Sequence, residues 1–128
     1  MILAVLQARM SSSRLPGKVL RPIMGRSMLG RQIDRVRQAR RIDRLVVATS
    51  TDASDDVVAA FCAAEDVDCH RGSLLDLISR FRGAIRAFGP ADHIVRLTGD
   101  CPLADWTVID ACVELHLSEG AEYTGNSI

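Results

Sequence analysis

Residues 2–18, ILAVLQARMSSSRLPGK, join a short apolar run to a segment rich in cations and hydroxyl groups. The run at 2–6 contains no polar residue, which is typical of a strand buried on both faces of a parallel sheet. Pro16 prevents the segment that follows from forming one continuous helix. This stretch therefore predicts a buried first strand that leads into a charged loop.

Similar apolar runs recur along the chain, at residues 45–48 and 93–97, and we expect both to form buried strands. Segments with apolar residues at helical spacing predict helices at 28–39, 55–64, 74–88 and 105–118. Alternation of strands and helices in this order favours an α/β domain with a mostly parallel sheet. We expect residues 123–128 to begin another strand, so the chain reads as a truncated domain.

Three of the four predicted helices have an expected apolar face, and two have a recognisable start. Ser54 is the expected N-cap of the helix at 55–64, and Gly72-Ser73 are expected to open the helix at 74–88. The expected apolar faces consist of Leu29, Ile33 and Val36; of Leu74, Leu77, Ile78, Phe81 and Ile85; and of Trp106, Ile109, Cys112 and Val113.

The overall charge excludes a general attraction to polyanions. The 128 residues, about one domain in length, have a formal net charge of zero, which favours neither nucleic acid nor an anionic membrane surface as a partner. The arginines between positions 31 and 44 alternate with acidic residues and glutamines, and no aromatic residue lies among them to stack on a base. We interpret this segment as a solvated helix face.

The cysteines and the first residues indicate a cytoplasmic protein without a membrane segment. The four cysteines lack the spacing of a metal site or a disulfide scaffold, so we expect reduced thiols. The apolar run at 2–6 is too short for a signal sequence or a membrane span.

The loop after the first strand has the composition of an anion site. Ligands of open α/β sheets bind beyond the carboxyl ends of the strands, which is where this loop is expected. Arg9, Arg14 and Lys18 supply cationic donors and Ser12 supplies a hydroxyl, a combination that suits a polyphosphate. The P-loop pattern and the GxGxxG pattern are both missing from the sequence. The alternative is a solvated loop with incidental charges.

The same loop resembles the N-terminal signature of the cytidylyltransferases that act as CMP-KDO and CMP-sialic acid synthetases. It shares with that signature Ala8-Arg9, Ser12, Arg14-Leu15-Pro16 and Lys18. Three later strings are similar to the spore-coat polysaccharide biosynthesis protein F type of this family: VVATSTDASDD (46–56), HRGSLLDLISRF (70–81) and VRLTGDCPL (95–103). The resemblance covers essentially all of residues 1–128, which correspond to the nucleotide-binding N-terminal part of longer members.

The resemblance implies a Rossmann-like, three-layer nucleotidyltransferase fold of the glycosyltransferase-A type. It also implies transfer of CMP from CTP to a sugar acid, with release of pyrophosphate, for cell-surface or spore-coat polysaccharide synthesis. In this family Arg9 and Lys18 would act on the leaving pyrophosphate, and Asp100 would hold Mg²⁺. The nucleotide-binding set implied by the motifs is Ala8, Arg9, Ser12, Arg14, Lys18, Arg71 and Asp76.

Two of these residues have a structural alternative. Asp100 also fits a turn between Gly99 and Pro102. Asp76 fits a capping box that begins at Ser73, and it is the weakest of the nucleotide candidates.

Two other functions and two oligomeric states stay open. A nucleotide-sugar-dependent glycosyltransferase would share the fold but usually carries Asp-x-Asp where this chain has Gly-Asp-Cys-Pro. A non-catalytic nucleotide-binding module is the second alternative. The sequence does not decide between a monomer and a homodimer.

Overall fold

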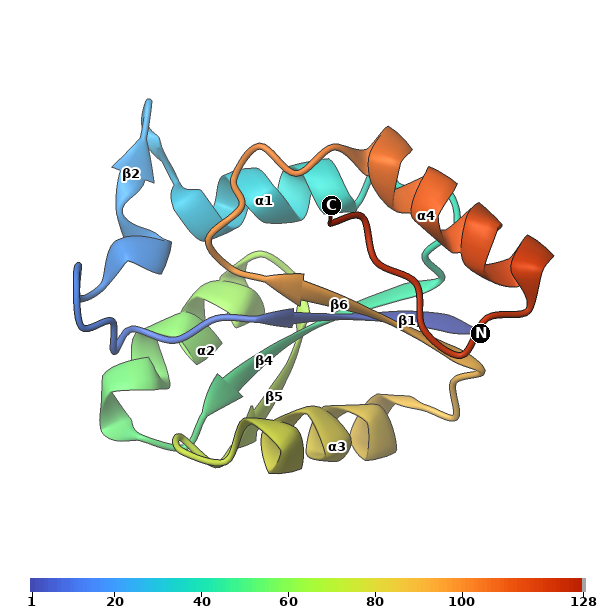
Figure 1. Ribbon diagram of the computed structural model, residues 1–128. Helices are drawn as coiled ribbons and strands as arrows, with labels where there is room; N and C mark the ends of the chain where they lie inside the picture. Colours follow the sequence, from blue (N-terminus) through green and yellow to red (C-terminus); the bar gives the residue numbers. More distant parts are fainter. Residues whose placement is uncertain (128) are drawn as a thin grey trace.

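A four-stranded parallel sheet forms the centre of the molecule in a computed structural model, which describes residues 1–127 (Figure 1). Its strands are β1 (Ile2–Gln7), β4 (Arg44–Ser50), β5 (Asp68–Gly72) and β6 (His93–Thr98), in the order β5-β4-β1-β6. A small antiparallel hairpin of β2 (Pro22–Ile23) and β3 (Arg26–Ser27) stands apart from the sheet. The predicted α/β class with a mostly parallel sheet is confirmed.

The first strand occupies an interior position because it pairs on both edges. Leu3 lies opposite Arg44 of β4, and Ile2 lies opposite His93 of β6. The side chains from Leu3 to Leu6 are completely buried, as the unbroken apolar run predicted. All four strands run in parallel, so their carboxyl ends meet at one edge of the sheet.

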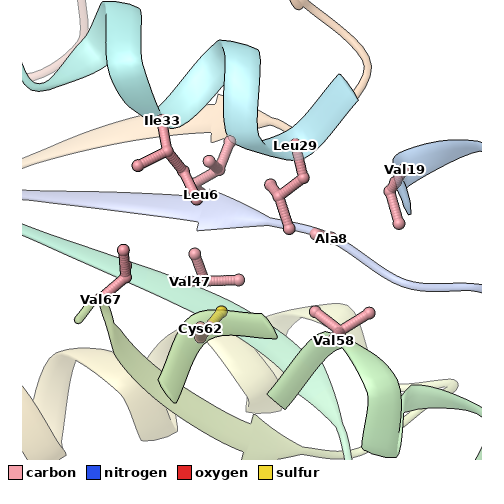
Figure 2. Close-up of a cluster of buried hydrophobic side chains, with 9 residues drawn as sticks. All are labelled: Leu6, Ala8, Val19, Leu29, Ile33, Val47, Val58, Cys62 and Val67. Atoms are coloured by element: carbon pink, nitrogen blue, oxygen red, sulfur yellow. The ribbon is translucent and has the colours of Figure 1, made fainter. Parts of the chain in front are cut away.

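Helices cover both faces of this sheet. Figure 1 shows α1 (Met28–Val36) and α4 (Trp106–Glu119) on one side and α3 (Leu77–Phe88) on the other. Figure 2 shows the larger core cluster, where side chains of α1 and α2 (Asp56–Ala64) meet beside β1 and β4. The cluster consists of Leu6, Ala8, Val19, Leu29, Ile33, Val47, Val58, Cys62 and Val67. A second cluster lies against α3, where Ala84 packs on Leu3, Val5, Val46 and Ala48.

Several helix boundaries differ from the expected ones. Helix α1 ends at Val36, three residues early, because the chain turns so that Arg40 and Arg41 donate main-chain hydrogen bonds to Asp110 of α4. Before α2, a 3₁₀ turn (Ala53–Asp55) is capped by Asp52, which accepts from the main-chain N–H of Ser54. The expected capping by Ser54 is therefore wrong.

Helix α3 begins at Leu77 and not at residue 74, and its cap is Asp76, whose side chain accepts from Ser79 N at 2.9 Å. Ser73 instead accepts from Asp76 N at 3.0 Å, one turn before the helix. Ile78 is exposed, in contrast to its predicted place on the apolar stripe, while Arg80 of the same helix is buried.

Two strand predictions also need correction. Strand β6 is not buried on both faces, since Ile94 and Arg96 are exposed. Within the described sheet it is an edge strand that pairs with β1 alone. Residues 123–127 form no strand, and Ile128 lies outside the described residues. Strand β5 had no counterpart among the predictions.

No helix within residues 1–127 combines the length and the apolar character needed to cross a membrane. The four cysteines are free thiols, as expected.

Candidate functional site

The carboxyl edge of the sheet gathers the polar segments that the sequence singled out. The loop at 8–18 follows β1, the turn at 51–55 follows β4, and the turn at 99–102 follows β6. Arg71 lies in β5, near the same edge. Ligands of open α/β folds bind at this edge, so these segments form the candidate site.

The loop at 8–18 is closed by its own main chain. Gly17 N donates to Met10 O at 2.7 Å, and Leu15 N donates to the Ser12 hydroxyl at 3.3 Å. Gly17 adopts a left-handed conformation with φ of 73°, which favours glycine because it has no Cβ. Lys18 then begins a 3₁₀ turn (Lys18–Leu20). The loop is therefore a folded element.

The cations of this loop are accessible. Arg9 and Arg14 are exposed, and neither forms an ion pair with another residue in the range 1–127. Lys18 Nζ lies 4.0 Å from Asp100 Oδ2, and both side chains reach solvent. The fold thus brings the cationic loop and the carboxylate after β6 together, although they are far apart in sequence.

Asp100 is held in a turn that packs tightly on β1. Gly99 N donates to Gln7 O at 2.7 Å, so β6 stays hydrogen-bonded to β1 one residue beyond the strand. The hydroxyl of Thr98 is the largest influence that lowers the pKa of Asp100, and the Lys18 ammonium acts in the same direction. Asp100 is therefore ionised at neutral pH, and its side chain is exposed to solvent.

A buried side chain of α1 holds both ends of this turn. Gln32 is 1% exposed, and its Nε2 donates to Thr98 O at 2.8 Å. Its Oε1 accepts from Cys101 N at 3.3 Å. The two hydrogen bonds bracket Gly99 and Asp100, so the position of the carboxylate depends on α1.

The donor set at Asp100 fits a hard cation that is partly coordinated by a ligand. Among the described residues, no group of three or more His, Cys, Asp or Glu side chains surrounds a common point. Mg²⁺ commonly binds through one or two carboxylates plus phosphate oxygens and water, so one accessible carboxylate beside a phosphate site suits it.

Arg71 uses its donors inside the protein. Its Nε donates to Ser50 O at 2.8 Å, and its Nη2 donates to Asp52 O at 2.9 Å and to Asp56 Oδ1 at 2.7 Å. These contacts tie β5 to the turn after β4. The role that the structure shows for Arg71 is therefore to hold this turn in place.

Two further predicted site residues have structural roles. Ala8 is buried, and its N–H donates to Ala48 O at 3.1 Å, which extends the sheet beyond β1. Asp76 is itself the N-cap of α3, so its role is structural, although the capping box expected from Ser73 would have placed it inside the helix.

Two buried charged side chains near this edge were not among the predicted site residues. Asp55 is completely buried and accepts a hydrogen bond from Met10 N in the loop. Arg80 of α3 is 1% exposed, and burial followed by the nearby Arg9 lowers its pKa. The sequence offered only a weak signal for Arg80, as a cation within an apolar helix pattern, and none that separated Asp55 from Asp52 and Asp56.

The arginines between positions 31 and 44 are mostly engaged within the fold. Four of them bind elements remote in sequence: Arg35 donates to Ala104 O, Arg37 to the carbonyls of Glu65 and Asp66, and Arg41 and Arg44 pair with Glu114 and Asp68. The arginines of the predicted solvated face thus also connect helices and strands through hydrogen bonds and ion pairs.

Comparison with known proteins identifies relatives of this chain. A family model described as "Cytidylyltransferase" matches residues 3–127. The spore coat polysaccharide biosynthesis protein SpsF of Bacillus subtilis is 41% identical over 127 residues, which are 96% of this chain and 52% of that protein. A 3-deoxy-manno-octulosonate cytidylyltransferase of Syntrophotalea carbinolica is 39% identical over 112 residues, 88% of this chain and 44% of that protein.

Solved structures show the same architecture. A cytidylyltransferase from Leptospira borgpetersenii superposes with a TM-score of 0.83 at 36% identity, over 91% of this chain and 49% of that one. A CMP:2-keto-3-deoxy-manno-octonic acid synthetase complexed with CTP superposes with a TM-score of 0.77 at 25% identity, over 94% of this chain and 48% of that one. The chain thus spans about half the length of these relatives.

Proposed function

The chain belongs to the cytidylyltransferase family, and we propose that it binds CTP in an enzyme that transfers CMP to a sugar acid. The observation that carries the proposal is the meeting of the loop at 8–18 with Asp100, where Lys18 Nζ and Asp100 Oδ2 are 4.0 Å apart. Cations beside a carboxylate suit a metal-bound triphosphate, which presents both negative charge and metal-bridged oxygens.

In the proposed reaction a sugar hydroxyl attacks the α-phosphorus of CTP. The bond from that phosphorus to the bridging oxygen breaks, and pyrophosphate leaves. Arg9 and Lys18 bind the triphosphate and neutralise the charge that grows on the departing pyrophosphate. Ser12 and Arg14 contribute further donors from the same loop. The protein acts by positioning and by charge, and no protein nucleophile is required.

Asp100 would hold Mg²⁺, which when bound supplies positive charge to the phosphate oxygens. Its lowered pKa suits this role, because an ionised carboxylate is the form that binds a cation. Arg71 is the proposed wall of the cytidine pocket. Because Arg71 is hydrogen-bonded to Ser50, Asp52 and Asp56, we propose that it fixes the shape of this pocket and does not reach out to the ligand.

The proposed substrate class is a sugar acid of the 3-deoxy-manno-octulosonate kind, destined for a cell-surface or spore-coat polysaccharide. This proposal rests on the similarity to the spore coat polysaccharide biosynthesis protein SpsF and to the 3-deoxy-manno-octulosonate cytidylyltransferase. We further propose that residues 1–128 are the nucleotide-binding N-terminal part of the enzyme and that the enzyme is cytoplasmic. Light scattering would distinguish a monomer from the alternative, a homodimer.

Nucleotide binding is tested by thermal unfolding with Mg²⁺ and CTP, UTP, GTP or ATP in separate samples. A ligand at a hundred times its dissociation constant adds about 2.7 kcal/mol to the free energy of unfolding. We expect this stabilisation with CTP, its loss in Arg9→Ala, and its retention in Arg40→Ala, which removes an exposed arginine remote from the loop. Equal stabilisation by all four nucleotides would contradict a cytidine-specific site.

Turnover is tested on the full-length enzyme by pyrophosphate release with 3-deoxy-manno-octulosonate as acceptor. Arg9→Ala and Asp100→Asn should each lower the rate roughly a hundredfold, the scale on which a preorganised charge contact contributes. Near-normal rates in both variants would overturn the assignment of these residues. Binding of CTP without any release of pyrophosphate, whichever sugar acid is supplied, would instead favour a non-catalytic module.

A further inference from the structure

Asp55 is a charged residue in an unusual location. It ends the 3₁₀ turn after β4 and is 0% exposed. A carboxylate without solvent is costly unless hydrogen bonds satisfy its oxygens. Both oxygens are satisfied here: Oδ1 accepts from Met10 N at 2.7 Å, and Oδ2 accepts from the hydroxyl of Ser50. The first of these bonds reaches 45 residues back along the sequence, into the loop at 8–18.

Met10 closes that loop through hydrogen bonds of its main chain. Its N–H is held by Asp55, and its carbonyl accepts from Gly17 N at 2.7 Å. Arg9 immediately precedes this point, and Lys18 immediately follows the other end of the closure. The bond from Asp55 to Met10 therefore connects the turn after β4 to the residue whose main chain closes the loop that carries both cations.

The charges around Asp55 are consistent with this role. Arg80 is buried beneath the same edge, where its Nη1 donates to Ser73 O at 3.0 Å and its Nε has no partner within residues 1–127. Arg9 lowers the pKa of Arg80 and Asp55 raises it, so the three charges interact. Asp55 is thus a buried anion that partly offsets the charge of the buried Arg80.

We propose that Asp55 is a positioning residue for nucleotide binding: through Met10 N it presets the loop at 8–18 so that Arg9 and Lys18 face the triphosphate. The inference rests on the proposed function, because the ligand in question is CTP. Asp55 itself has no oxygen free for a ligand, so its effect passes through the main chain of the loop.

Four variants separate this role from a general contribution to the core. Asp55→Ala removes both hydrogen bonds, whereas Asp55→Asn keeps an oxygen that can accept from Met10 N. Of the two bonds to Asp55, Ser50→Ala removes only the second, together with the bond from Asp52 N to the Ser50 hydroxyl at 3.2 Å. Val46→Ala, in the cluster against α3, is the control for lost stability alone, because it is fully buried but lies outside the loop contacts.

The first measurement is the dissociation constant of CTP with Mg²⁺, obtained by calorimetry at a temperature where each protein is folded. We expect Asp55→Ala to bind at least tenfold more weakly than the wild type. The dissociation constant of CTP should stay within about threefold of the wild-type value in the other three variants, Asp55→Asn, Ser50→Ala and Val46→Ala; a factor of ten corresponds to about 1.4 kcal/mol. Equal affinity in Asp55→Ala and the wild type would overturn the inference. An equal loss in Ser50→Ala would overturn it too, since the Met10 bond remains in that variant.

The second measurement needs no nucleotide and works even if Asp55→Ala does not fold. Hydrogen exchange of the Met10 amide, followed by NMR, should be slow in the wild type, because this N–H is bonded to a buried carboxylate. Exchange as fast as that of an exposed loop amide in the wild type would overturn the inference. A wild type that binds no CTP but protects the Met10 amide would instead overturn the proposed function.

Discussion

Replacing Gly99 with alanine tests how closely β6 must approach β1 where the candidate site begins. A methyl group on Gly99 would lie 2.6 Å from Gln7 O and 3.2 Å from the Cβ of Ala8. Both neighbours belong to β1 or to the residue after it, so neither can rotate away. The strand end must therefore shift, which strains the bond from Gly99 N to Gln7 O.

The expected cost has two parts. Overpacking of a close contact costs ~1–3 kcal/mol. Loss of the main-chain hydrogen bond adds ~0.5–1.5 kcal/mol, so together the free energy of unfolding should fall by ~2–4 kcal/mol. Asp100 follows directly in sequence and moves with Gly99. We therefore also expect CTP to bind at least tenfold more weakly.

Urea denaturation measures the first effect and calorimetry with Mg²⁺ and CTP the second. Gly125→Ala is the matched control: its added methyl would meet only ordinary contacts of 3.5–3.7 Å, so stability should change by less than ~0.5 kcal/mol. A Gly99→Ala protein as stable as this control would refute the argument that close approach of the two strands sets the site.

Three further predictions concern the surroundings of Asp100. Gln32→Leu removes the hydrogen bonds to Thr98 O and Cys101 N, so urea denaturation should show a loss of ~1–3 kcal/mol; unchanged stability would contradict the bracketing role. The pKa of Asp100 is lowered chiefly by Thr98. The contacts that stabilise the ionised carboxylate are therefore fully present above its ordinary pKa of 3.8 and are lost only as the pH falls through the lowered pKa. An NMR titration of this carboxyl group should show a midpoint below 3.8, and Thr98→Val should raise that midpoint. Iodoacetamide should modify the exposed Cys101 before the buried Cys62, and CTP with Mg²⁺ should slow the reaction; equal rates at the two thiols, measured by mass spectrometry, would be the contrary result.

The strands that could be predicted from the sequence are those marked by an unbroken run of apolar residues. The apolar runs of β1 and β4 match interior strands because each of these strands pairs on both edges. Strand β5 reads Asp-Cys-His-Arg-Gly and carries no apolar signal. Its conformation depends on pairing with β4, from Val46 opposite Asp68 to Ser50 opposite Gly72, which a local pattern does not encode.

The start of α3 was misplaced for a similar reason. The Gly72-Ser73 pair predicted a helix from residue 74, yet Arg80 donates to the carbonyls of Ser73 and Leu74. These bonds hold both residues outside the helix, and Asp76 becomes the cap. The long-range cause is the burial of Arg80, which depends on the tertiary fold.

The candidate site divides along the same line. The cations of the loop and the carboxylate at position 100 could be identified from the sequence by residue type, and their places after parallel strands predicted that they meet at one edge of the sheet. The residues that hold them in position could not be predicted. Asp55 is one of three aspartates within residues 52–56, and only the folded chain shows that this one reaches Met10. Gln32 lies between Leu29 and Ile33 on the apolar face of α1. A polar residue in that place is unusual, but the sequence does not show which groups it bonds.

The interior position of β1 also governs the order in which the chain is able to assemble. Its contacts with the β4 side span 41 residues, as from Ile2 to Asp43, and those with the β6 side span 91, as from Met1 to Asp92. At ~5–20 residues per second, the ribosome completes β6 several seconds after β4. During that interval the first strand has only one neighbour, so nascent chains stalled between these points should be cleaved faster by protease than chains that extend past Thr98. Strand β1, which precedes the other three strands of the sheet in the chain, is thus among the last to become fully enclosed.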